Sequence, residues 1–155
     1  MFLNAIGTCC DSMGCDRSTH LFYKIYLQMI FSEKVLLSSK TEMPRLAFGT
    51  WQIPGSDVVR CVSDAIKAGY RHIDTAQSFG VESLVGQAVR ESGVPREDIF
   101  VSTKVPAGVK SVEGAISSIL ASLKSLNLGY IDMLLIHSPL LEGQTRGVKR
   151  FFKEN

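Results

Sequence analysis

From Leu46 onward, short apolar stretches typical of strands alternate with longer stretches of helical periodicity. Strands are predicted over 46–50, 70–75, 99–105 and 131–137, with a helix in each interval. This alternation favours a parallel sheet, because a helical crossover returns the chain to the sheet in the same direction. The 155 residues suit about one domain, and 45% of them are hydrophobic, which is enough for a core. We therefore expect an α/β fold.

The three helices carry start and stop signals. The first is predicted to be capped by Ser56 and stopped by Gly69, the second spans about 82–92, and the third begins after Ser111. The third helix has an apolar face made of Val112, Ala115, Ile116, Ile119, Leu120 and Leu123. The strand at 131–137 is a nearly continuous apolar run, which predicts burial on both of its faces.

A hairpin is predicted before the alternating region, with strands at 34–39 and in the stretch MPRLAFG. Residues 1–32 have no clear period. They are interpreted as a flexible extension or a mispredicted exon, so the folded domain is predicted over 33–155. Three of the four cysteines lie in the extension without C-x-x-C spacing. They are interpreted as free thiols, and no metal site is expected.

Charge and hydropathy limit the partners. The net charge is +2, from 17 basic and 15 acidic side chains, which gives no electrostatic reason to expect binding to nucleic acid or to an anionic membrane. The apolar run at 21–31 is shorter than the roughly 20 residues that span a bilayer. We expect a soluble, cytoplasmic chain without nucleic-acid or membrane partners.

Three polar residues occupy the same place in successive strands. Asp74, Lys104 and His137 each lie at the carboxyl end of a predicted strand, separated by 30 and 33 residues. Sites form at this end of parallel sheets, and neighbouring strands lie about 4.8 Å apart, so the three side chains can meet. A charged pair beside an imidazole can hold and orient a carbonyl group.

Each of these residues also has a structural interpretation. A single Asp or Lys at a strand end is commonly a solvated loop charge, and His137 can belong to a turn before a proline. The convergence of three strand ends favours an active site over three separate coincidences. His72 shares the strand parity of Asp74 but lies deeper, and it is interpreted as a packing histidine of the core.

Three motifs carry a resemblance to a known family: MPRLAFGTWQ, GYRHIDTAQSFGVESLVGQAVRESGVPREDIFVSTKV and SLKSLNLGYIDMLLIHSP. Together they make the region from about 35 to 146, roughly 110 residues, similar to the N-terminal half of the aldo-keto reductases. The resemblance implies a (β/α)₈ TIM barrel that reduces aldehydes and ketones, its small carbonyl substrates, with NADPH as cofactor.

The resemblance also implies roles for individual residues. Family members use a catalytic tetrad of Asp, Tyr, Lys and His. Asp74, Lys104 and His137 match three members of it, and Phe79 stands at the position of the proton-donating tyrosine. The residues matched to cofactor binding are Gly49, Thr50, Trp51 and Asp74.

The chain departs from the family in two ways. Phe79 has no proton to give. A full barrel takes about 250 residues, whereas about 120 follow the start of the hairpin. We therefore expect a partial, truncated barrel of about the first four βα units. In the family, strands five to eight carry most contacts to the cofactor, and the sequence has no G-x-G-x-x-G stretch as a substitute. The chain alone is thus expected to bind NADPH weakly or not at all.

Three interpretations stay open from the sequence. The chain is an aldo-keto reductase by descent that is inactive as written, or a non-catalytic pseudoenzyme that acts through protein contacts, or a non-functional gene-model fragment. Two open sheet edges would favour self-association in any of these cases, since unpaired edges invite a further strand.

Overall fold

The computed structural model describes residue 26 and residues 29–138. A two-stranded antiparallel hairpin comes first, formed by β1 (Lys34–Leu36) and β2 (Glu42–Pro44). It is followed by a four-stranded sheet in the order β3-β4-β5-β6, in which every neighbouring pair is parallel. The sheet strands are β3 (Phe48–Gly49), β4 (His72–Asp74), β5 (Phe100–Val105) and β6 (Met133–Ile136). The predicted hairpin and parallel sheet are confirmed.

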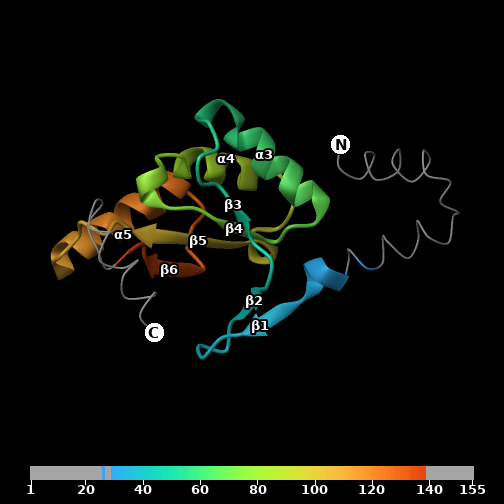
Figure 1. The fold of residues 1–155 in the computed structure, drawn as a ribbon, viewed down its shortest axis with the longest axis horizontal. Coiled ribbons are helices and arrows are strands. Elements are labelled where there is room, and N and C mark those ends of the chain that lie inside the picture. Colours follow the sequence, from blue (N-terminus) through green and yellow to red (C-terminus); the bar gives the residue numbers. More distant parts are fainter. Residues whose placement is uncertain (1–25, 27–28, 139–155) are drawn as a thin grey trace, which may run out of the picture.

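Three helices connect the parallel strands. They are α3 (Gly55–Ala68), α4 (Glu82–Glu91) and α5 (Val112–Leu126), and two short 3₁₀ turns accompany them, η1 (Gln77–Phe79) and η2 (Arg96–Asp98). In the view of Figure 1, α3 and α4 lie above the sheet and the hairpin lies below it. Successive side chains of a strand point to opposite faces. Alternate side chains of each strand therefore face the helices, and the side chains between them face the side that would be the inside of a barrel.

The core lies between the sheet and the helices. It is built from apolar side chains of α3, α4, β4, β5, the end of α5 and the segments just before β5 and β6, among them Val58, Val62, Ile73, Val85, Val89, Ile99, Val101, Leu126 and Leu128. Gly86 of α4 lies directly against the end of α5. A Cβ added at Gly86 would be 1.9 Å from the carbonyl oxygen of Leu126, so the two helices approach as closely as a glycine allows.

The helix caps were partly predicted. Ser111 caps α5 as expected, since its hydroxyl accepts a hydrogen bond of 3.0 Å from the amide of Gly114. The prediction for Ser56 is wrong. The first helix begins two residues earlier than a Ser56 cap implies, at Gly55, and Pro54 is its N-cap residue. The Pro54 carbonyl already accepts from the Asp57 amide at 2.8 Å, so a serine side chain is not needed there.

The apolar face of α5 and the strand at 131–137 differ from the prediction. Leu134, Leu135 and Ile136 of β6 are exposed, because β6 is an edge strand that pairs only with β5 among the described residues. On α5, Val112, Ile116 and Leu120 are each more than half exposed, and the residues buried towards the rest of the fold include Ser118 and Ser122. The predicted burial of the strand at 131–137 on both faces is wrong for the described part of the chain, and the apolar face predicted for the third helix is partly exposed.

Arg96 ties the start of β6 to β5. Its guanidinium donates to Asp132 Oδ2 at 2.6 Å and to the Tyr130 carbonyl at 2.9 Å, and it lies 3.9 Å from the centroid of the Tyr130 ring. Asp132 Oδ2 also accepts from the Val101 amide at 2.9 Å. The ion pair is largely buried, so this end of β6 is firmly attached.

Residues 1–25, 27–28 and 139–155 lie outside the described part. The interpretation of residues 1–32 as an extension, and the domain bounds of 33–155, therefore stay predictions. Phe31 is described, and its ring packs edge-on against Tyr70 with 4.9 Å between centroids. None of the helices in the described residues is long and apolar enough to cross a membrane.

Candidate active site

Asp74 and Lys104 form an ion pair at the carboxyl end of the sheet. Asp74 ends β4, and Lys104 lies near the end of the adjacent strand β5. Lys104 Nζ donates to Asp74 Oδ2 at 2.7 Å and to the Thr75 carbonyl at 2.9 Å. The side chains are 17% and 31% exposed for Lys104 and Asp74. The pair is thus shielded from bulk water and still reachable from one side.

Phe79 and His137 lie beside this pair. The turn η1 carries Phe79 back over the strand ends, and Gly80, in the left-handed conformation with φ of 69°, ends the turn. The Phe79 ring centroid is 5.5 Å from Lys104 Nζ and also 5.5 Å from the His137 ring, which it meets edge-on. Phe79 therefore presents an apolar ring to both residues, and it brings no polar atom to them.

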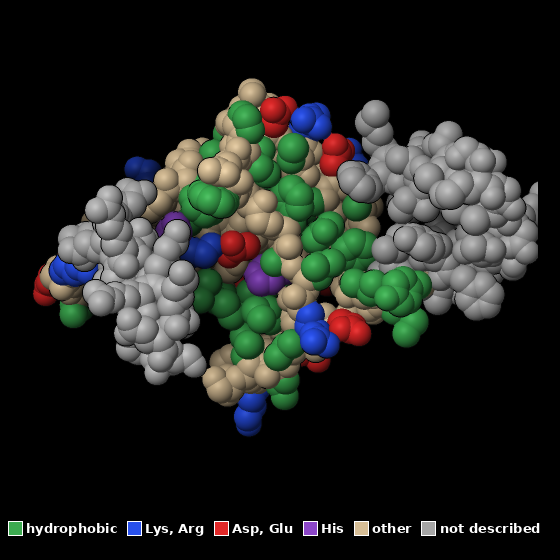
Figure 2. Space-filling model, viewed as in Figure 1, with side chains coloured by type: hydrophobic (Ala, Val, Ile, Leu, Met, Phe, Trp, Pro, Cys, Tyr) green, Lys and Arg blue, Asp and Glu red, His purple; other side chains and the backbone are tan. Residues whose placement is uncertain are grey.

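Figure 2 shows basic, acidic and histidine side chains gathered next to apolar surface on one face of the molecule. The described tyrosines near the sheet do not join this group. Tyr70 and Tyr130 precede β4 and β6 and so lie at the amino ends of the strands. Tyr70 packs against Phe48, and Tyr130 lies under Arg96. Neither of these two hydroxyl groups replaces the one that Phe79 lacks.

The end of β3 lies next to the ion pair. Gly49 is the sheet neighbour of Asp74, and a Cβ added to it would meet no atom within 4 Å. Trp51 is 67% exposed just beyond. Thr50 is buried, with its hydroxyl 3.0 Å from Thr75 Oγ1 and 3.2 Å from the Asp74 carbonyl. Open space beside an exposed indole suits a flat aromatic ring, whereas the Thr50 hydroxyl is occupied in holding β3 to β4.

Ser102 contacts Asp74, and His72 contacts Ser102. Ser102 Oγ donates to Asp74 Oδ1 at 2.7 Å, and His72 Nε2 lies 3.0 Å from the same Ser102 Oγ. Burial lowers the pKa of His72 from 6.5. Ser102 was not predicted from the sequence as a site residue. Its place two residues before Lys104 on the same strand is the signal that could have found it, because such residues point to the same face.

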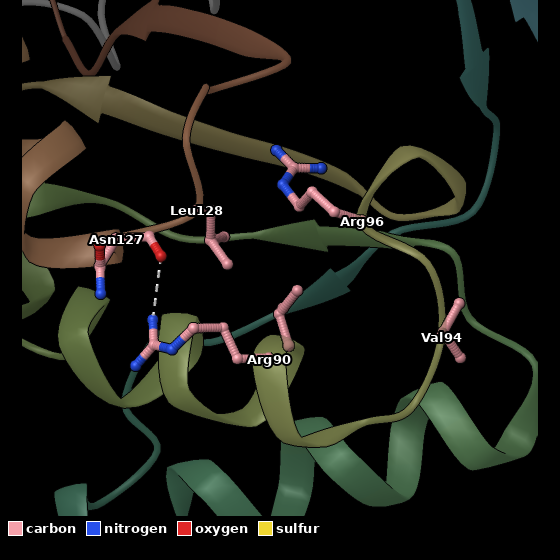
Figure 3. Close-up of a pocket in the computed structure, with 6 residues that line it drawn as sticks. Arg90, Val94, Arg96, Asn127 and Leu128 are labelled. Carbon is pink, nitrogen blue, oxygen red and sulfur yellow. Dashed lines mark hydrogen bonds between the residues drawn. The ribbon is translucent and has the colours of Figure 1, made fainter.

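A pocket of about 270 Å³ lies at the opposite end of the sheet, lined by Val89, Arg90, Val94, Arg96, Asn127 and Leu128 (Figure 3). Arg90 Nη1 donates to the carbonyls of Leu126 at 2.8 Å and Asn127 at 3.3 Å, and Arg96 is bound to Asp132. Both guanidinium groups hold the fold together there, so this pocket is separate from the Asp74–Lys104 site.

Comparison with known proteins identifies the family. A sequence model of the aldo/keto reductase family matches residues 45–143, which include Asp74, Phe79, Lys104 and His137. The chain belongs to the aldo/keto reductase family. The reductase fold places the ion pair at the end of the sheet where members of (β/α)₈ folds build their sites.

Individual reductases agree with this assignment. An aldo-keto reductase from Mycolicibacterium smegmatis is 40% identical over 111 residues, which is 72% of this chain and 40% of that protein. The crystal structure of an aldo/keto reductase from Brucella melitensis has a TM-score of 0.68 and 39% identity, and the match covers 78% of this chain and 47% of the other.

A Bombyx mori aldo-keto reductase solved in complex with NADP gives a TM-score of 0.66 at 36% identity, over 70% of this chain and 38% of that one. The described residues are therefore a partial TIM-barrel fold. This chain spans less than half the length of each of these relatives.

Proposed function

We propose that this site descends from one that reduces aldehydes and ketones with NADPH, and that it lacks the proton donor as the sequence stands. The observation behind the proposal is the Phe79 ring, 5.5 Å from both Lys104 Nζ and the His137 ring. Carbonyl reduction adds a hydride to carbon and a proton to oxygen, and the donor must reach that oxygen. A phenyl ring has no such proton, and losing a general acid costs about 10² to 10⁴ in rate.

The roles of the remaining residues follow from their chemistry. The cofactor would supply the hydride when bound. His137 would orient the carbonyl by hydrogen bonding, and Asp74 would keep Lys104 in place beside it. Gly49 and Trp51 would border the flat ring of the cofactor, which fits the open space there.

The phosphates of NADPH have weaker support. They need several cationic or backbone N–H donors, and Lys104 is already bound to Asp74. We expect the 155-residue chain to bind NADPH weakly or not at all in a fluorescence titration. Saturable binding at micromolar concentration would contradict this part of the proposal.

The proton-donor argument is tested with a chimera. Residues 34–140 replace the matching part of an active family member, once with Phe79 and once with Phe79→Tyr. We expect the tyrosine version to reduce an aromatic aldehyde at least 100-fold faster, on the order of a lost general acid. Equal rates would refute the argument. Two inactive chimeras that both bind NADPH would show that Phe79 is not the decisive change.

A second candidate function, contact with another protein chain, is favoured by the exposed edge strand. Leu134, Leu135 and Ile136 are exposed on β6, and β3 forms the other open edge of the same parallel sheet. Open strand edges are templates for pairing, and β6 of one copy can extend the sheet of a second copy at β3. The occupant that we propose is therefore a second copy of this chain.

Light scattering after size exclusion tests this candidate. The purified chain should be a dimer or larger, Leu135→Lys should shift it to monomer, and Leu36→Lys on the exposed hairpin should not. A monomeric chain, or an equal response to both substitutions, would rule the self-association out. The cytoplasmic location and the lack of nucleic-acid and membrane partners stay predictions.

A further inference from the structure

A chain of hydrogen bonds runs from the hairpin to the ion pair through buried side chains. His72 is 7% exposed and Ser102 is 1% exposed, and both lie on the face of the sheet that carries Asp74 and Lys104. We propose that His72 is a positioning residue for the Asp74–Lys104 pair and that it acts through the hydroxyl group of Ser102. This inference concerns the same site but does not depend on what the loss of the tyrosine at position 79 does.

The direction of each hydrogen bond follows from what its partners can donate. Asp74 is held by the Lys104 ammonium and so accepts as a carboxylate. The single proton of the Ser102 hydroxyl therefore points to Asp74 Oδ1, at 2.7 Å, a length typical of a bond to a charged oxygen. Ser102 Oγ can then only accept from His72 Nε2, at 3.0 Å, so Nε2 carries the imidazole proton.

The other ring nitrogen, Nδ1, faces the carbonyl of Pro44, which can only accept. His72 Nδ1 lies 3.2 Å from the carbonyl of Pro44, which is the longest of the three contacts that link Pro44, His72, Ser102 and Asp74. A neutral imidazole has one N–H, so only one of its two contacts can be donated by the ring, and the contact to Ser102 Oγ is the shorter of the two. Burial lowers the pKa of His72 and thereby favours the neutral ring.

The groups around His72 have opposing charges. Burial lowers the pKa of His72 most, the Pro44 carbonyl and the carboxylates of Asp74 and Asp132 raise it, and the Lys104 ammonium lowers it. The remaining neighbour, Phe100, meets the imidazole edge-on with 4.8 Å between ring centroids, and it offers no charge. Burial is the largest of these effects, so the ring is expected to be neutral near neutral pH. In that state His72 Nε2 donates to Ser102 Oγ, and the Ser102 hydroxyl donates to Asp74.

The consequence for the site is a fixed carboxylate. Ser102 holds Oδ1 of Asp74 and Lys104 holds Oδ2, so the carboxylate cannot rotate without losing one of two charge-assisted bonds. Asp74 Oδ2 in turn fixes Lys104 Nζ. The position of the ammonium beside the Phe79 ring therefore depends on His72 indirectly, through Ser102 and Asp74. His72 does not touch Lys104 or the space where a carbonyl would bind.

The test is ¹⁵N NMR of the His72 ring in the 155-residue chain at about pH 8, where neutral histidine reports its tautomer. The wild type should show the proton on Nε2. Asp74→Asn should move it to Nδ1. In this variant the side-chain amide oxygen at position 74 still accepts from Lys104, and the amide NH₂ group donates to Ser102 Oγ. The Ser102 hydroxyl then turns and donates its own proton to His72 Nε2. No direct bond joins residue 74 to His72, so a histidine that only packs would not respond.

Ser102→Ala removes the oxygen that accepts from His72 Nε2. In this variant, too, the proton should move to Nδ1, which faces the Pro44 carbonyl. Ser118→Ala is the matched control, since it removes a buried serine bonded to Gln77 and should keep the proton on Nε2. A wild type with the proton on Nδ1 overturns the proposal, and so does an Asp74→Asn chain that keeps it on Nε2. If Ser102→Ala does not fold, the nearly isosteric Asp74→Asn alone decides.

Discussion

Gly86→Ala should destabilise the fold by about 2 kcal/mol, although alanine is the better helix former. Alanine in a helix is favoured over glycine by about 1 kcal/mol. At Gly86, however, the new methyl group would be 1.9 Å from the Leu126 carbonyl oxygen and must retreat beyond 3.0 Å. The obstacle is backbone, so α4 and α5 have to move apart by more than 1 Å. Overpacking of this kind costs typically 1–3 kcal/mol, and with a rigid carbonyl as the obstacle we expect the upper end, partly offset by helix propensity.

The measurement is urea unfolding of the wild type, Gly86→Ala and Gly55→Ala. Gly55 begins α3, and its added methyl group would meet only the end of the Leu84 side chain, at an ordinary 3.7 Å. Gly55→Ala should therefore be neutral or slightly stabilising. A loss of about 2 kcal/mol corresponds to a fall in melting temperature of roughly 6 °C for a chain of 155 residues. If Gly86→Ala is as stable as Gly55→Ala, the close approach of α4 and α5 is not as described.

Three further outcomes are expected. Lys104→Met should lower the free energy of unfolding by about 2 kcal/mol, because it leaves the half-buried Asp74 carboxylate without its cation; this value lies between those for surface and buried ion pairs. The control, Lys34→Met on the exposed hairpin, should change it by less than about 0.5 kcal/mol. Ser111→Ala should cost about 1 kcal/mol through the lost cap of α5, measured by the same unfolding curves. The free energy of unfolding should also fall as pH drops below 6.5, because the imidazole of His72 binds a proton more readily in the unfolded chain than when it is buried. The fall should be shallower in His72→Gln, which lacks this imidazole.

The alternating pattern was enough to predict the parallel sheet, the hairpin and the meeting of Asp74 with Lys104, because these depend on period and on strand-end position. Ser102 was missed, since a serine inside a β-branched strand gives no sign of a polar partner until the register places it opposite Asp74. The apolar run of β6 was misjudged for a related reason. Hydrophobicity reports that a surface can be buried, and only the order of the strands shows that β6 lies at an edge.

The two ends of β6 are held by unequal contacts, the Arg96–Asp132 ion pair before its start and the hydrogen bond from the His137 amide to the Val105 carbonyl after its end. Its first residues are locked by the Arg96–Asp132 pair, and its later residues, Leu134 to Ile136, are exposed. Local fluctuations release the least buried segments at the lowest free energy, so β6 should peel from its carboxyl end. His137 follows directly after that end. We therefore expect the imidazole to leave the site at a lower free energy than is needed to open the Asp74–Lys104 pair between β4 and β5.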